Sequence, residues 1–230
     1  MGVGTMKKVT STFLFIFFSF ISLAGYAQSF MEFIVVGKAW PEHKWGHLSL
    51  RIKDPVRDEI YDFGRYGEMW GPLNSEGEPI LRVWTKANKS HLRYQKRGDP
   101  KIEVVNIPTS EAQSQAAFAY FDHLRQGAKA DAVRPYLTEY KLRGPSFHVV
   151  NHNCVTVAMG AFYTAFPELE KRGPRYARGD GLYFWARAKT NNVSYNKRED
   201  RWNHLWWPQD VLDFLEAEVV SHKRGAVARY

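Results

Sequence analysis

The chain contains one cysteine, Cys154, at the start of a segment whose pattern predicts a helix. After it, apolar residues recur at the spacing of one buried helical face and the run stops at Pro167: Val155, Ala158, Met159, Phe162 and Phe166. The amide groups and the dipole at a helix start favour an anion and lower the pKa of a thiol placed there. Cys154 is therefore a candidate nucleophile, although a lone cysteine is also commonly a buried structural residue.

A thiolate nucleophile needs a base to take its proton and a polar group to orient that base. His47 is the candidate base, since it begins segment 47–52, in which polar and apolar residues alternate as in a strand. Asp62 lies in segment 59–63, which is predicted to form the adjoining strand of a hairpin. A carboxylate there would fix the tautomer of the imidazole and raise its basicity. A histidine at a strand start is, however, commonly just a polar surface residue.

The elements around these residues follow from the same patterns. The N-terminal half is predicted to be mostly β, with strands at 33–38, 47–52, 59–63, 79–84, 91–96 and 101–107. Ser110 and Gln113 form a capping box for a helix that ends near Gly127. Segment 136–143 is expected to be an extended connection, and 147–150 a short approach to the cysteine helix. Residues 168–207 are expected to be loops with one short helix around 183–188, followed by a helix from Pro208 and a frayed tail after Ser221.

Residues 1–27 have the pattern of an export signal. Lys7 and Lys8 precede an apolar run at 13–23, and the small residues Gly25 and Ala27 stand where a signal peptidase cleaves. The run is short for a membrane span, which needs about 20 residues, although an uncleaved anchor is the alternative. We expect a signal peptide at 1–27 and one catalytic domain at 28–230, exported to the periplasm or secreted.

Export places the single cysteine in an oxidising compartment, where it can form no internal disulfide. The fold must therefore rest on a hydrophobic core, which a mature chain of this length can supply as one domain. The formal net charge is +8, and removal of Lys7 and Lys8 leaves +6 for residues 28–230. Such a surface favours peripheral contact with an anionic membrane or wall. The basic residues are scattered and no nucleic-acid motif occurs, so we expect no nucleic-acid partner.

Three short segments carry a family resemblance: GHLSLRI at 46–52, IYDFG at 60–64 and NCVT at 153–156. They resemble the circularly permuted NlpC/P60 group of papain-like proteins, which includes lecithin retinol acyltransferase-like bacterial families. The resemblance implies an α+β fold in which an antiparallel sheet or partial barrel packs against a cysteine-bearing helix and further helices. It also implies that His47 is the base, Asp62 the orienting residue and Cys154 the nucleophile. Many relatives have histidine or another polar residue at the position of Asp62.

Other polar and aromatic residues near these segments are candidates for binding. Asn151, His152 and Asn153 are types that shape and cap a helix start. We expect Trp45, His152 and Asn153 to contact substrate, while most of the remaining tryptophans pack in the core. A metal site could draw on five residues: His43, His47, Asp62, His148 and His152. However, the spacing of four between His43 and His47, on a loop and a strand, does not bring two imidazoles together as it would on a helix. We therefore predict no metal and no cofactor.

The sequence thus predicts an exported cysteine hydrolase that acts by acyl transfer on cell-envelope material. The preferred substrate is an amide bond in peptidoglycan peptides, because an exported enzyme meets that polymer at once. One alternative is a lipid or lipoprotein acyl hydrolase or acyltransferase. Another is a non-catalytic envelope-binding protein that keeps the fold. The oligomeric state is left open.

Overall fold

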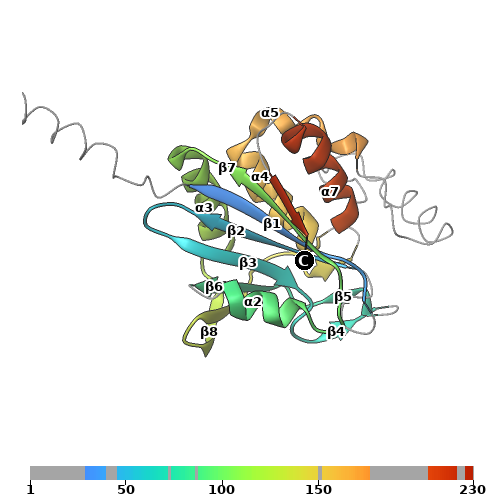
Figure 1. The fold of residues 1–230 in the computed structure, drawn as a ribbon. Coiled ribbons are helices and arrows are strands. Elements are labelled where there is room, and N and C mark those ends of the chain that lie inside the picture. The colour runs from blue at the N-terminus through green and yellow to red at the C-terminus, as the bar shows by residue number, and fades with distance from the viewer. Residues whose placement is uncertain are drawn as a thin grey trace, which may run out of the picture.

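A computed structural model describes residues 29–39, 46–71, 74–85, 88–149, 152–176, 207–221 and 226–229. Across these ranges the protein is an α+β structure in which antiparallel sheets pack against several helices (Figure 1). The predicted signal segment 1–27, the predicted helix around 183–188, Trp45 and His43 lie outside the described residues. None of the helices in the described part of the chain combines the length and apolar composition needed to cross a bilayer.

The main sheet is open, and its described strands lie in the order β11-β7-β1-β2-β3-β6-β9-β8, each paired antiparallel with its neighbours. The ends of the sheet do not close into a barrel. A smaller sheet has the order β10-β5-β4. The strands are β1 (Phe30–Val36), β2 (His47–Lys53), β3 (Asp58–Gly64), β4 (Met69–Trp70), β5 (Glu76–Gly77), β6 (Ile80–Thr85), β7 (Ile102–Pro108), β8 (Lys129–Arg134), β9 (Leu137–Lys141), β10 (Phe147–His148) and β11 (Ala226–Arg229).

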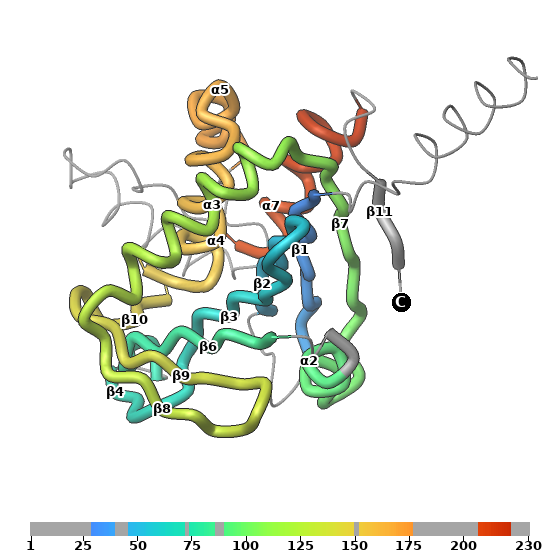
Figure 2. The backbone as a smooth tube through the Cα atoms, turned by 90° about the vertical axis from the view of Figure 1, so that its left-hand side faces the viewer, coloured from blue at the N-terminus to red at the C-terminus, as the bar shows by residue number. Residues whose placement is uncertain are grey.

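Helices cover both faces of the main sheet (Figure 2). One face carries α3 (Glu111–Leu124), α4 (Cys154–Ala165) and α7 (Pro208–Leu215), which continues as the π-helical turn η3 (Glu216–Val220). The other face carries α2 (Asn88–Gln95). The short α5 (Pro167–Glu170) and η2 (Gly173–Arg175) follow α4. Because strand side chains alternate between faces, each strand in the middle of the sheet contributes to both layers.

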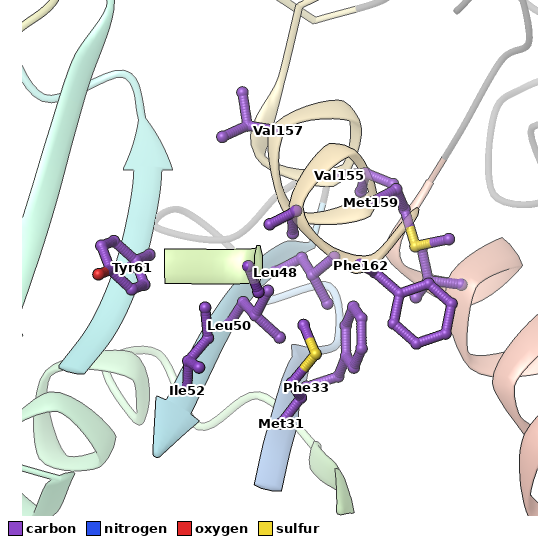
Figure 3. Close-up of a cluster of buried hydrophobic side chains, with 14 of the residues drawn as sticks. Met31, Phe33, Leu48, Leu50, Ile52, Tyr61, Val155, Val157, Met159 and Phe162 are labelled. Carbon is purple, nitrogen blue, oxygen red and sulfur yellow. The ribbon is translucent and has the colours of Figure 1, made fainter. Parts of the chain in front are cut away.

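The larger core lies between the sheet and α3, α4 and α7 (Figure 3). Leu48 and Leu50 of β2 point toward α4, as the alternation in the sequence predicts. Phe162 of α4 is fully buried, and its ring centroid lies 5.4 Å from that of Phe33 and 6.1 Å from that of Phe214. The aromatic residues of this layer thus connect β1, α4 and α7 and fix the position of the cysteine helix on the sheet.

The smaller core lies beneath α2 and is partly polar. Ile34, Ile60 and Trp84 are buried there against Leu92 of α2. Between them, Asp62 of β3 and His91 of α2 have no exposed surface. Buried polar groups are stable only when they are hydrogen-bonded, so this layer depends on the contacts of Asp62.

Most predicted elements are confirmed, within a few residues, at 33–38, 47–52, 59–63, 79–84 and 101–107, and so are the helices after Ser110, at Cys154 and at Pro208. The predicted capping box of Ser110 and Gln113 is present. The strand predicted at 91–96 is wrong, since these residues lie in and after helix α2. The tail after Ser221 is not simply frayed, because β11 pairs with β7.

We expect Phe162→Ala to lower the free energy of unfolding by about 3–5 kcal/mol, because it removes a ring packed on all sides and leaves a cavity. Val56→Ala is the matched control, since the Val56 side chain is 85% exposed and should change stability by less than about 0.5 kcal/mol. Urea denaturation followed by tryptophan fluorescence measures both. Equal losses in the two variants would contradict the proposed packing.

Candidate functional site

His47 is the first residue of β2, so its ring stands at the end of the sheet rather than in the middle. Gly46 precedes it with a φ of 74°, a conformation that glycine adopts without strain. A side chain at position 46 would also place a Cβ 3.0 Å from the carbonyl oxygen of Val36. The glycine therefore lets the chain enter β2 with His47 directed toward the neighbouring strand.

The side chain of Asp62, on the adjacent strand β3, contacts the ring of His47. The register pairs Leu50 with Tyr61, and its continuation brings Asp62 to the same face as His47 and diagonally next to it. Nε2 of His47 lies 2.5 Å from Oδ1 of Asp62, and the Asp62 side chain is fully buried. The hairpin predicted from sequence thus brings these two residues into direct contact.

Three further groups hold the carboxylate of Asp62 in place. The Tyr66 hydroxyl donates to Oδ1 over 2.6 Å, and the Gln95 amide donates to Oδ2 over 3.0 Å. Nε2 of His91 lies 3.5 Å from Oδ2 and 3.1 Å from the Ser49 hydroxyl. His91 and Gln95 are one helical turn apart, so α2 presents both to the same carboxylate. These contacts fix the orientation of Asp62 and, through it, the ring of His47.

The charges in this cluster shift the pKa values of both Asp62 and His47. Burial alone would raise the pKa of Asp62, but the charge and hydrogen bond of His47, together with His91, hold it far below its usual range. Burial alone would lower the pKa of His47, but the charges of Asp62 and Cys154 and their hydrogen bonds raise it well above its usual value. The imidazole is therefore suited to hold a proton between the carboxylate and the thiol.

Cys154 is the first residue of α4, as predicted. Asn153 caps the helix: its side-chain oxygen accepts from the backbone N–H of Val155 over 2.9 Å and of Thr156 over 3.0 Å. The Thr156 hydroxyl in turn accepts from the backbone N–H of Asn153 over 2.9 Å. The cap leaves the N–H of Cys154 itself at the open end of the helix, where it can donate to an oxyanion.

The thiol and the imidazole meet at one cavity of about 160 Å³. Its wall includes both Cys154 and His47, and the sulfur is close enough to raise the pKa of the imidazole. Since Nε2 of His47 is bonded to Asp62, Nδ1 is the ring nitrogen that remains for the thiol. Arg65 also lines the cavity, where the charge of Cys154 raises its pKa although burial has the larger, lowering effect.

The structure places the predicted binding residues Asn153 and His152 differently with respect to the cavity. Asn153 lines the cavity next to Cys154, in addition to capping α4. His152 does not line it; its ring packs against Phe63, with centroids 4.8 Å apart, and its Nδ1 lies 3.2 Å from the carbonyl oxygen of Ser146. Burial lowers the pKa of His152. Trp207 is buried and also lines the cavity.

Four residues of this site were missed from the sequence: Tyr66, His91, Gln95 and Arg65. The spacing of His91 and Gln95 is a helical signal, but segment 91–96 was interpreted as a strand. Tyr66 and Arg65 follow β3 directly, and only the three-dimensional structure shows that they turn back over Asp62 and Cys154.

Of the five residues considered for a metal site, His47, Asp62, His148 and His152 lie within the described ranges and His43 does not. No group of three or more His, Cys, Asp or Glu side chains within the described ranges is arranged to hold a metal ion. His47 and Asp62 bond each other instead, and His148 pairs with His152 through the backbone. Comparison with family models, curated proteins and solved structures finds no match to this chain.

We expect Asp62→Asn to remove a pH-dependent part of the stability. The pKa of the folded carboxyl lies below its unfolded value, so the stabilisation is present above about pH 4 and is lost as pH falls. The difference in free energy of unfolding between wild type and variant should shrink below about pH 4 with a slope approaching 1.4 kcal/mol per pH unit.

Urea titrations at several pH values measure this difference. Asp131→Asn is the control, because Asp131 is exposed on β8 and should give a nearly constant difference. A flat difference for Asp62→Asn across the acid range would contradict the buried ion pair.

Proposed function

We propose that the protein is an exported cysteine hydrolase of the permuted NlpC/P60, papain-like type, which cleaves amide bonds in cell-envelope material. The observation that carries the proposal is the imidazole of His47, bonded at 2.5 Å to the buried Asp62 and adjacent to the thiol of Cys154 at a helix start. A nucleophile, a base and an orienting carboxylate in one cavity are the parts required for thiol acyl transfer.

The proposed reaction uses each of these groups in turn. Nδ1 of His47 takes the thiol proton first and holds it, and Sγ of Cys154 then bonds to the carbonyl carbon as a thiolate. The N–H of Cys154 and the guanidinium of Arg65 stabilise the oxyanion. The C–N bond then breaks as His47 gives its proton to the leaving nitrogen. Water attacks the thioester with His47 as base, which releases the acid and restores the thiol.

Peptidoglycan peptides are the preferred substrate, since the signal pattern at 1–27 would deliver the enzyme to that polymer. A lipid or lipoprotein acyl group is the second candidate, favoured by one observation. Met69 and Trp70 of β4 are 46% and 40% exposed, and β4 is joined through β5 to β10, whose Phe147 lines the cavity. Exposed apolar residues beside a cavity suit a membrane surface.

We expect iodoacetamide to alkylate Cys154 in the folded wild type at neutral pH. His47→Ala should slow this reaction markedly, because the imidazole that holds the thiol proton is lost. Mass spectrometry of quenched samples measures the rate. His123→Ala is the control, since His123 lies near the end of α3 and does not line the cavity. Labelling that requires unfolding would instead identify Cys154 as a structural residue.

Cys154→Ala should abolish turnover of the true substrate with little loss of stability. Purified sacculi and vesicles of defined phospholipids, incubated separately with wild type and variant, distinguish the two enzyme hypotheses by whether new amino groups or free fatty acids appear. Thermal denaturation checks that the variant is folded. Envelope binding equal in wild type and variant, with no product from either substrate, would identify a non-catalytic binding protein and overturn the proposal.

A further inference from the structure

A second cavity lies on the face of the sheet covered by α2, and its volume of about 450 Å³ exceeds that of the catalytic cavity. Four arginines line it: Arg82 of β6, Arg93 of α2, Arg97 just beyond α2, and Arg134 of β8. The other lining residues are aromatic, aliphatic or hydroxyl-bearing, and none is an aspartate or glutamate. The cavity therefore concentrates positive charge without an acidic side chain in its wall.

Only one of these arginines is neutralised within the described residues. Arg82 pairs with Glu139 at 2.5 Å. No carboxylate in the described ranges lies within ion-pairing distance of the other three arginines, Arg93, Arg97 and Arg134. All three are exposed, so water and salt screen part of their mutual repulsion, and a bound anion would relieve the remainder. The positive potential also acts on Tyr136, whose pKa is lowered by hydrogen bonds from Arg134 and Ser90 and by the charges of Arg134 and Arg93.

Aromatic rings lie against two of the four guanidinium groups, those of Arg82 and Arg97. The guanidinium of Arg82 lies 3.6 Å from the ring centroid of Tyr66 and 5.4 Å from that of Tyr94, whose hydroxyl it also bonds at 3.0 Å. The guanidinium of Arg97 lies 4.9 Å from the Tyr94 centroid. Arginines held by stacking lose less conformational entropy when they bind an anion, and their planar donors match a carboxylate.

The two cavities share a wall. Tyr94 and Arg97 line both the catalytic cavity and the arginine cavity. A ligand whose carbonyl lies at Cys154 can therefore continue past Tyr94 toward the arginines. The two shared side chains are a phenol and a guanidinium, which suit a peptide backbone better than an acyl chain.

We infer that the arginine cavity binds a carboxylate of an acidic peptide, with Arg93, Arg97 and Arg134 as its ligands. This inference deepens the proposed hydrolase function and rests on it for the role of the peptide as substrate. The cleaved amide lies at Cys154, and the recognised carboxylate lies further along the same chain, beyond Tyr94. The arginines then set specificity, while Cys154 and His47 perform the reaction.

The test measures binding of N-acetyl-tetraglutamate by isothermal titration calorimetry, with N-acetyl-tetraglutamine amide as the neutral probe. Wild type should bind the acidic peptide more tightly than the neutral one, and added salt should weaken that binding. The triple variant Arg93→Gln, Arg97→Gln, Arg134→Gln should bind it roughly ten-fold or more weakly, since it loses charge-assisted hydrogen bonds.

A second triple variant, Lys129→Gln, Arg143→Gln, Lys171→Gln, removes the same charge from exposed residues outside both cavities and should bind like wild type. Equal weakening in both triple variants, or no preference for the acidic peptide in wild type, overturns the inference. Arginine-dependent binding to phosphatidylglycerol vesicles but not to tetraglutamate also overturns it, and assigns the cavity to an anionic lipid.

The same measurement in Cys154→Ala separates this inference from the proposed function. Cys154→Ala should retain the arginine-dependent binding, since Cys154 does not line the arginine cavity. Retained binding with no hydrolysis of sacculi by wild type would sink the hydrolase proposal and leave the carboxylate site standing. On sacculi that are cleaved, the arginine variant should raise KM with little change in kcat.

Discussion

The contact between His47 and Asp62 is the interaction on which the candidate site depends. A carboxylate with no exposed surface is costly unless its charge is balanced and its oxygens are bonded. Asp62 meets both conditions through His47, Tyr66 and Gln95, with His91 close by. Because the strand register sets the distance between His47 and Asp62, a slip of one residue between β2 and β3 would turn one of them to the opposite face. The fold therefore specifies the site through the sheet rather than through a local motif.

The nucleophile reaches this pair from a different layer. Cys154 belongs to α4, which packs on the apolar face of the sheet, whereas Asp62 belongs to the polar face beneath α2. The two layers meet at the end of β2, where His47 bonds Asp62 and lines the same cavity as Cys154. The packing of Phe162 against β1 and α7 holds α4 at the depth that brings its first residue to the imidazole. Helix α4 therefore both packs in the hydrophobic core and positions Cys154 in the site.

The fold and the catalytic candidates were largely predictable because their signals are local. Alternation identified β2 and β3, and the three-and-four spacing after Cys154 identified α4. Helix α2 was misassigned because Leu92 and Tyr94 imitate strand alternation, while the positions that it buries most deeply, His91 and Gln95, are polar. All six residues of β8 are exposed, so it has no apolar pattern and forms only because β9 pairs with it. Contacts made through polar burial or through pairing alone leave no hydrophobic periodicity in the sequence.

Two sides of helix α2 contact different parts of the molecule. His91 and Gln95 point inward to Asp62, and Arg93, with Arg97 just past the helix end, lies at the arginine cavity. Substitutions of the outer residues leave the contacts with Asp62 intact, so the arginine cavity can change without loss of the contacts that hold the carboxylate. Related proteins can in this way acquire different ligand preferences while their reacting residues stay the same. We expect the sequence differences that accompany such a change to lie in this one short helix.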